Sequence, residues 1–135
     1  MHKLFLNIAI SPDLYLKDPE SSELGKKIVS HSIILIDELG FEGFTFKKLS
    51  KEINSTESTI YRYFENKHML LLYLTCWYWS WVEYSLVFGT HNIKSAEERL
   101  RIALDIITKP VTEDNSFFHI NEVLLHQIII SESTK

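Results

Sequence analysis

Residues 45–67 read TFKKLSKEINSTESTIYRYFENK, and this stretch decides the fold because it predicts two short helices joined by a tight turn. Apolar residues recur at helical spacing on both sides of a polar break, Phe46, Leu49 and Ile53 before it and Ile60 and Phe64 after it. Asn54, in the break, tolerates the left-handed backbone of a sharp turn, and Ser55 or Thr56 can cap the second helix. The stretch therefore predicts a helix-turn-helix, a motif that places its second helix in the major groove of DNA.

Further residues on either side extend this pattern over about 26–72. They are Gly40-Phe41, Thr45, Leu49-Ser50, the run Thr59-Ile60-Tyr61-Arg62-Tyr63-Phe64, and Lys67. With them the segment resembles the N-terminal domain of transcriptional regulators of the tetracycline-repressor (TetR) type. Three positions depart from the pattern of that family: Asn54 and Ser58 stand where smaller residues are usual, and Glu57 places a negative charge near the DNA phosphates.

The resemblance implies which side chains contact DNA. It places Thr45, Tyr63 and Lys67 on backbone phosphates. It also implies that five residues of the second helix of the motif, the recognition helix, face the major groove: Glu57, Ser58, Thr59, Tyr61 and Arg62. The fork of Arg62 matches guanine O6 and N7, and Glu57 could accept a hydrogen bond from cytosine N4. Alternatively, Tyr61 packs against the first helix, Glu57 complements the helix dipole and Arg62 is solvated.

The charge balance is uneven along the chain. The whole chain has a net charge of −4, but residues 26–67 carry seven Lys or Arg against six Asp or Glu, and the remainder carries seven against twelve. A segment with a net charge of +1 favours DNA only weakly, so we expect a few placed residues to contact phosphates instead of a broad basic patch. The single cysteine, Cys76, forms no internal disulfide, which indicates a cytoplasmic protein.

Start and stop signals predict helices throughout, so the expected fold class is all-α. Asp18-Pro19-Glu20 should open a first helix that ends at Gly40, Thr45 should cap the second helix, and the third should span 56–65. Three more helices should follow at about 67–88, from Ser95 to before Pro110, and from Asp114 or Asn115 to about 131. We expect an N-terminal arm over 1–17, a DNA-binding domain over 18–66, and a partial or truncated helical ligand and dimerisation domain over 67–135.

An aromatic stripe runs along the fourth predicted helix and comprises Tyr73, Trp77, Trp81, Tyr84 and Phe88. Aromatic residues at helical spacing mostly fill a core, and we expect this of Trp77. The resemblance implies a pocket for an apolar or aromatic effector beside this helix, so Trp81, Tyr84 and Phe88 are the candidate walls. The uncharged run 69–82 has fourteen residues, fewer than the ~20 that span a membrane, so we expect no membrane helix.

Neither catalysis nor metal binding is indicated. His119, Glu122 and His126 fall on one helical face and could hold a metal, but a surface or interface face is the better interpretation. The sequence shows no pattern that would pair a nucleophile with a general base, and it has no glycine-rich phosphate loop. We therefore expect that the protein is not an enzyme and binds neither a cofactor nor a metal.

Together these features predict a homodimeric TetR-like regulator that binds a double-stranded DNA operator. We expect it to be an effector-responsive repressor that releases DNA when a small molecule binds the helical domain. The alternative is an all-α module that binds protein or ligand and keeps the helix-turn-helix scaffold without specific DNA binding. Salt-dependent binding to duplex DNA discriminates the two.

Overall fold

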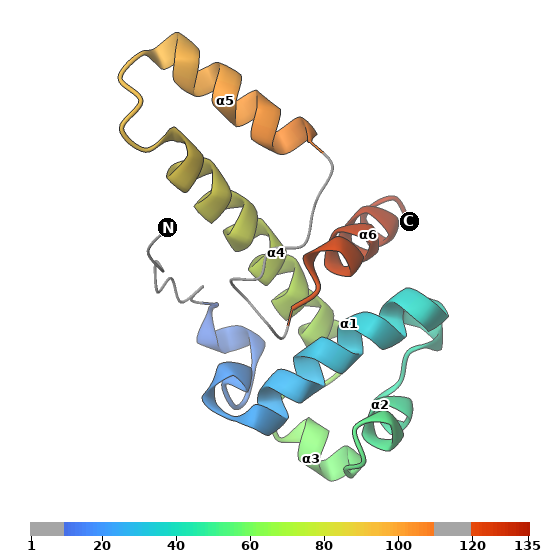
Figure 1. Ribbon diagram of the computed structural model, residues 1–135. Coiled ribbons are helices and arrows are strands. Elements are labelled where there is room, and N and C mark those ends of the chain that lie inside the picture. Colours follow the sequence, from blue (N-terminus) through green and yellow to red (C-terminus); the bar gives the residue numbers. More distant parts are fainter. Residues whose placement is uncertain (1–9, 110–119) are drawn as a thin grey trace.

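A computed structural model describes residues 10–109 and 120–135, and every regular element in these two ranges is helical, which confirms the all-α class. Two 3-10 turns, η1 (Pro12–Leu14) and η2 (Pro19–Ser21), come first. Six α-helices follow: α1 (Glu23–Gly43), α2 (Phe46–Glu52), α3 (Glu57–Tyr61), α4 (Lys67–Thr90), α5 (Ala96–Thr108) and α6 (Glu122–Ser133) (Figure 1). Most of the N-terminal arm and the expected helix start at Asp114 or Asn115 lie outside the described residues.

The sequence signals for helix starts are confirmed at four helices. In each case the side chain of the capping residue accepts a hydrogen bond from a backbone N–H in the first turn, which would otherwise lack a partner. The caps are Thr45 for α2, Thr56 for α3, Asn66 for α4 and Ser95 for α5. These polar residues therefore decide where each helix begins.

The first helix begins later than predicted. Asp18 does accept from the N–H of Glu20 at 2.9 Å, but it opens only the turn η2. The extended backbone of Ser22 (φ −150°) interrupts the helical path, and the Ser22 hydroxyl then caps α1 through the N–H of Gly25 at 2.9 Å. At the other end Gly40 has φ +74°, a left-handed conformation that stops the regular helix as predicted before one further turn to Gly43.

The third helix is shorter than predicted and ends at Tyr61. Beyond it, the carbonyl of Tyr63 accepts from the N–H of Leu16 at 2.8 Å. The helix α6 begins at Glu122, where Asn121 caps it through the N–H of Leu124 at 3.1 Å, and its predicted start lies outside the described residues.

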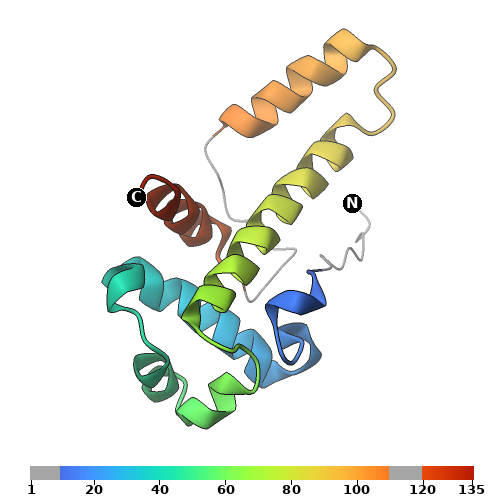
Figure 2. The ribbon, with the colours of Figure 1, turned by 180° about the vertical axis from the view of Figure 1, so that it is seen from behind.

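The core is formed by α1, α2, α3, the first half of α4, and α6, which packs against both α1 and α4. We call residues 23–78 together with α6 the body. Residues 79–109, the outer half of α4 and α5, form a hairpin that projects from the body, and none of them is buried. The α2–α3 pair lies at one end of the molecule and α5 at the opposite end (Figures 1 and 2). The first half of α4 thus shares a core with the predicted DNA-binding domain, and the domain boundary at residue 67 stays a prediction.

Candidate DNA-binding site

The turn between α2 and α3 has the geometry that the sequence predicted. Asn54 adopts φ +55°, the left-handed conformation expected of it. The next residue, Ser55, donates its N–H to the carbonyl of Ser50 at 2.8 Å, which closes the turn. The small side chain of Ser50 is buried, so the two helices approach closely there. This turn fixes the angle between α2 and α3.

The outer face of α3 carries polar side chains on the protein surface. Glu57, Ser58, Tyr61 and Arg62 are exposed, whereas Thr59 is partly buried and its hydroxyl lies 2.9 Å from that of the cap Thr56. Four of the five predicted groove residues are therefore accessible. The hydroxyl of Thr59 is instead engaged with the cap at the start of its own helix.

Tyr61 is half-exposed, and its ring also packs edge-on against Phe46 with ring centroids 5.0 Å apart. The packing partner is thus on α2, and not on the first helix as in the alternative interpretation. This contact braces α3 against α2, and 47% of the Tyr61 side chain stays exposed.

Two of the predicted phosphate ligands have their polar atoms engaged within the protein. Tyr63 is only 2% exposed, and its hydroxyl lies 2.7 Å from the hydroxyl of Ser22. The ammonium of Lys67 donates to the carbonyls of Phe41 and Phe44 at 2.8 and 2.9 Å. Contacts of Tyr63 and Lys67 with phosphate stay predictions, and both would require these bonds to be exchanged. The third predicted ligand, Thr45, is exposed, although its hydroxyl caps α2.

Sequence reasoning counted the lysines of α2 but did not assign them to the site. Lys47 and Lys51 are exposed, one turn apart, and within the described part of the chain their ammonium groups make no hydrogen bond or ion pair. Lys48, between them, donates to the carbonyl of Gly43 at 2.8 Å. The spacing of Lys47 and Lys51 on the helix that Thr45 caps was the signal that could have identified them.

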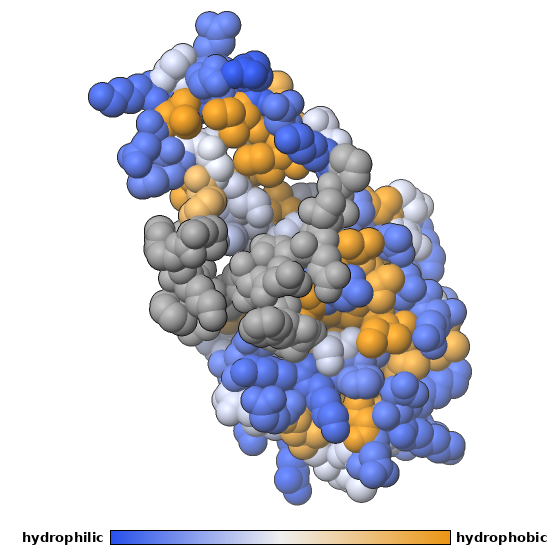
Figure 3. Space-filling model, in the orientation of Figure 1, coloured by the Kyte–Doolittle hydropathy of each residue, from blue (hydrophilic) through white to orange (hydrophobic). Residues whose placement is uncertain are grey.

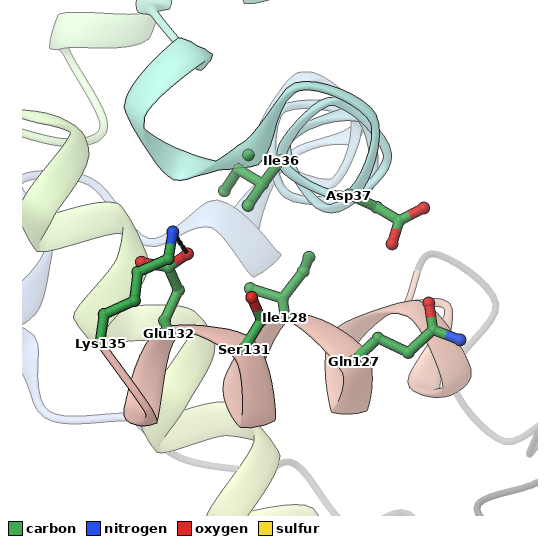
Figure 4. Close-up of a pocket in the computed structure, with 8 residues that line it drawn as sticks. Ile36, Asp37, Gln127, Ile128, Ser131, Glu132 and Lys135 are labelled. Atoms are coloured by element: carbon green, nitrogen blue, oxygen red, sulfur yellow. Dashed lines mark hydrogen bonds and ion pairs between the residues drawn. The ribbon is translucent and has the colours of Figure 1, made fainter.

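The aromatic stripe of α4 changes from core to surface along its length. Tyr73 and Trp77 are buried, Trp81 and Tyr84 are half-buried, and Phe88 is exposed. Trp77 is therefore a core residue, as expected. A hollow of about 200 Å³ lies elsewhere, between α1 and α6, and none of the predicted pocket residues lines it (Figure 4). The effector pocket at Trp81, Tyr84 and Phe88 stays a prediction.

The two possible metal ligands of the last helix that lie in the described residues are not arranged as a metal site. Glu122 is fully buried, and the Nδ1 atom of His126 lies 2.6 Å from the hydroxyl of Tyr78 on α4, while His119 is outside the described residues. Burial raises the pKa of Tyr78. In the described ranges no group of three potential ligands could hold a metal ion.

Within the same ranges no helix has both the length and the apolar character to cross a membrane.

Comparison with known proteins identifies the segment that carries this site. Residues 28–74 match the model of the family described as bacterial regulatory proteins, tetR family. No curated protein and no solved structure gives a significant match to the chain. The matched segment contains most of α1, all of α2 and α3, and the beginning of α4 with Lys67. The chain therefore carries, over residues 28–74, a helix-turn-helix segment that matches the N-terminal domain of bacterial regulatory proteins of the tetR family.

Proposed function

We propose that this protein is an effector-responsive repressor that binds a double-stranded DNA operator with the exposed face of α2 and α3. The observation that carries the proposal is the division of α3. Its apolar residue Ile60 is buried, whereas Glu57 and Ser58, and Arg62 directly after the helix, are exposed. The helix itself lies at the end of the molecule opposite α5 (Figure 1). Exposed polar groups that the fold itself does not use are available for the edges of bases.

Each group on this face has a suitable partner on DNA. The guanidinium of Arg62 makes no hydrogen bond or ion pair within the described residues, and it can donate two parallel bonds to guanine. Glu57 can accept from cytosine, and Ser58 and Tyr61 can contact either bases or phosphates. Thr45, with the lysines at 47 and 51, would hold the phosphates beside the groove.

The short recognition helix supports a dimer. With five residues, α3 reaches only a few base pairs, so one copy makes few specific contacts. Two copies on neighbouring half-sites double these contacts, and the operator is then a pseudo-palindrome. An effector that binds at Trp81, Tyr84 and Phe88 and favours another spacing of the two recognition helices would release the DNA. Apolar compounds that raise the melting temperature of the wild type, but not of Trp81→Ala, would support this pocket.

The direct experiment is selection of the operator from random duplexes, followed by titration at several salt concentrations. Arg62→Ala should cost about 1–3 kcal/mol and relax the preference at one base position. Arg101→Ala, an equal change on the exposed surface of α5, is the matched control and should bind as the wild type does. Absence of salt-dependent binding to any duplex would contradict the proposal and favour the non-DNA module, which the near-neutral charge of residues 26–67 allows.

A further inference from the structure

Lys67, the first residue of α4, has its ammonium group enclosed by backbone carbonyls. The Nζ atom lies 2.8 Å from the oxygen of Phe41, 2.9 Å from that of Phe44 and 3.4 Å from that of Glu42. It also lies 4.6 Å from the centroid of the Phe41 ring, within range of a cation–π interaction. An ammonium has three N–H donors, and three acceptors surround this one, so no donor is left over for a phosphate.

The position of this cation has an electrostatic cost that its partners offset. A positive charge in the first turn of a helix is unfavourable, because the helix dipole is positive at that end. The carbonyls of Phe41 and Glu42 belong to the short last turn of α1 beyond Gly40. That of Phe41 also accepts from the N–H of Phe44 at 3.2 Å, and carbonyls at the C-terminal end of a helix attract a cation. Lys67 thus places its charge at the favourable end of a neighbouring helix, across 26 positions of sequence from Phe41.

The third carbonyl connects this arrangement to the DNA-binding face. Phe44 directly precedes Thr45, the cap of α2, and the side chain of Phe44 is completely buried. Through Lys67 the start of α4 is therefore bonded both to the end of α1 and to the entrance of α2. Among the described residues, the other lysine that bonds to the segment 41–45 is Lys48, whose side chain is exposed and whose ammonium donates to the carbonyl of Gly43.

We infer that Lys67 is a positioning residue: it holds the segment 41–45 against α4, and so sets the orientation in which α2 presents Thr45 and Lys47 to DNA. This inference rests on the proposed function for its effect on DNA, but the positioning itself exists in the free protein. It assigns the role of phosphate contact to other residues, because the donors of Lys67 are used within the fold.

The first test compares Lys67→Met, which keeps the aliphatic stem and removes the donors, with Lys51→Met, an equal change at an exposed lysine of α2. Hydrogen exchange of the backbone amides of 44–48 is measured in the free protein by NMR. We expect exchange at least about tenfold faster in Lys67→Met and unchanged in Lys51→Met. Unchanged protection in Lys67→Met would overturn the inference. This measurement decides it even if the wild type binds no DNA, which would refute only the proposed function.

The second test uses the salt dependence of DNA binding. Removal of a phosphate contact lowers the slope of log K against log salt concentration by about one, whereas removal of a positioning contact weakens binding at an unchanged slope. We expect the unchanged slope for Lys67→Met. A slope lowered by about one would overturn the inference and restore the phosphate contact.

A third measurement needs no variant and applies if Lys67→Met fails to fold. The Nζ resonance of Lys67 in the wild type should show slow proton exchange and hydrogen-bond coupling to the carbonyls of Phe41 and Phe44. Both should persist in the complex with DNA. Loss of the coupling when DNA is added would show that the ammonium has moved to a phosphate, and absence of the coupling in the free protein would equally overturn the inference.

Discussion

The body and the hairpin use the same kinds of residues in opposite ways. In the body, apolar side chains from every helix meet in one core, and those of Ile28, Leu49 and Phe64 are completely buried. In the hairpin, Val87 and Leu100 are more than 60% exposed, and hydrophobic side chains are visible on its surface (Figure 3). The difference teaches that the body holds the proposed DNA-binding face by its own packing, while the hairpin gains little stability from burial.

A single helix, α4, connects the two regions and shows the change most clearly. Tyr73, in the first half, is buried, and burial with the nearby charge of Glu20 raises its pKa. Three turns further on, the side chains only partly contact α5, where Ile102 and Ile106 face α4 near Gly89. On the exposed surface of α5, Arg101 donates a hydrogen bond to Glu98, which lowers the pKa of the Glu98 carboxyl. Exposed pairs of this kind contribute little to the stability of the fold.

Two phenylalanines provide the strongest test of this comparison. Phe64→Ala should lower the free energy of unfolding by about 3–5 kcal/mol, because the ring is fully buried and packs edge-on against Tyr73 at 5.4 Å. Phe88→Ala, the same change in the hairpin, should cost well under half of that, since the side chain is 42% exposed. Denaturant melts measure both. Equal losses would show that the hairpin is as well packed as the body, against the comparison.

A pair of helical glycines gives a smaller effect of the same kind. A methyl group at Gly25 would overlap the backbone oxygen of Pro19, so Gly25→Ala must displace backbone. The expected cost is about 1–3 kcal/mol. At Gly89 the methyl group would meet the end of the Ile106 side chain, which can rotate away, and the better helix propensity of Ala offsets the crowding.

Thermal melts of the two alanine variants check this prediction. Gly89→Ala should melt within a few degrees of the wild type, whereas Gly25→Ala should melt clearly lower. A Gly89→Ala variant as unstable as Gly25→Ala would mean that the packing of α4 on α5 is rigid, and the hairpin would then have to be regarded as part of the core.

Local chemistry explains which features the sequence could predict. Caps, the turn at Asn54 and the helix stop at Gly40 depend on a few neighbouring residues, so their signals are present in the sequence itself. The start of α1 at Glu23 is set by Ser22, whose extended backbone follows η2, and the segment after Tyr61 bonds to the distant N–H of Leu16 through the carbonyl of Tyr63. A local pattern carries no information on such a distant partner.

The same distinction applies to the candidate site. The resemblance to the family implied that Glu57, Ser58, Tyr61 and Arg62 face DNA, and the structure leaves all four exposed. The bonding of Lys67 could not be predicted, because its acceptors lie more than twenty residues away and are backbone atoms. The identity of the side chain alone suggests a cation that is available to DNA. Only the fold shows that its ammonium group already donates hydrogen bonds to carbonyls within the protein.

The smallest effects are expected at two asparagines with left-handed backbone, one in each region. Asn54 has φ +55° in the turn between α2 and α3, and Asn92 has φ +63° in the loop between α4 and α5. A β-branched residue is strained in this conformation, so Asn54→Val should cost about 1–2 kcal/mol while Asn54→Gly should be tolerated. Asn92→Val introduces the same strain, but the loop it affects has no buried residue and can relax without opening the core. Its effect on the main unfolding transition should therefore be smaller than that of Asn54→Val, and hydrogen exchange should place the loss of protection in the hairpin alone. If Asn92→Val lowers the main transition as much as Asn54→Val does, the two regions unfold as one unit, and the exposed apolar surface of the hairpin must be stabilised in solution by contacts beyond those of this chain's described residues.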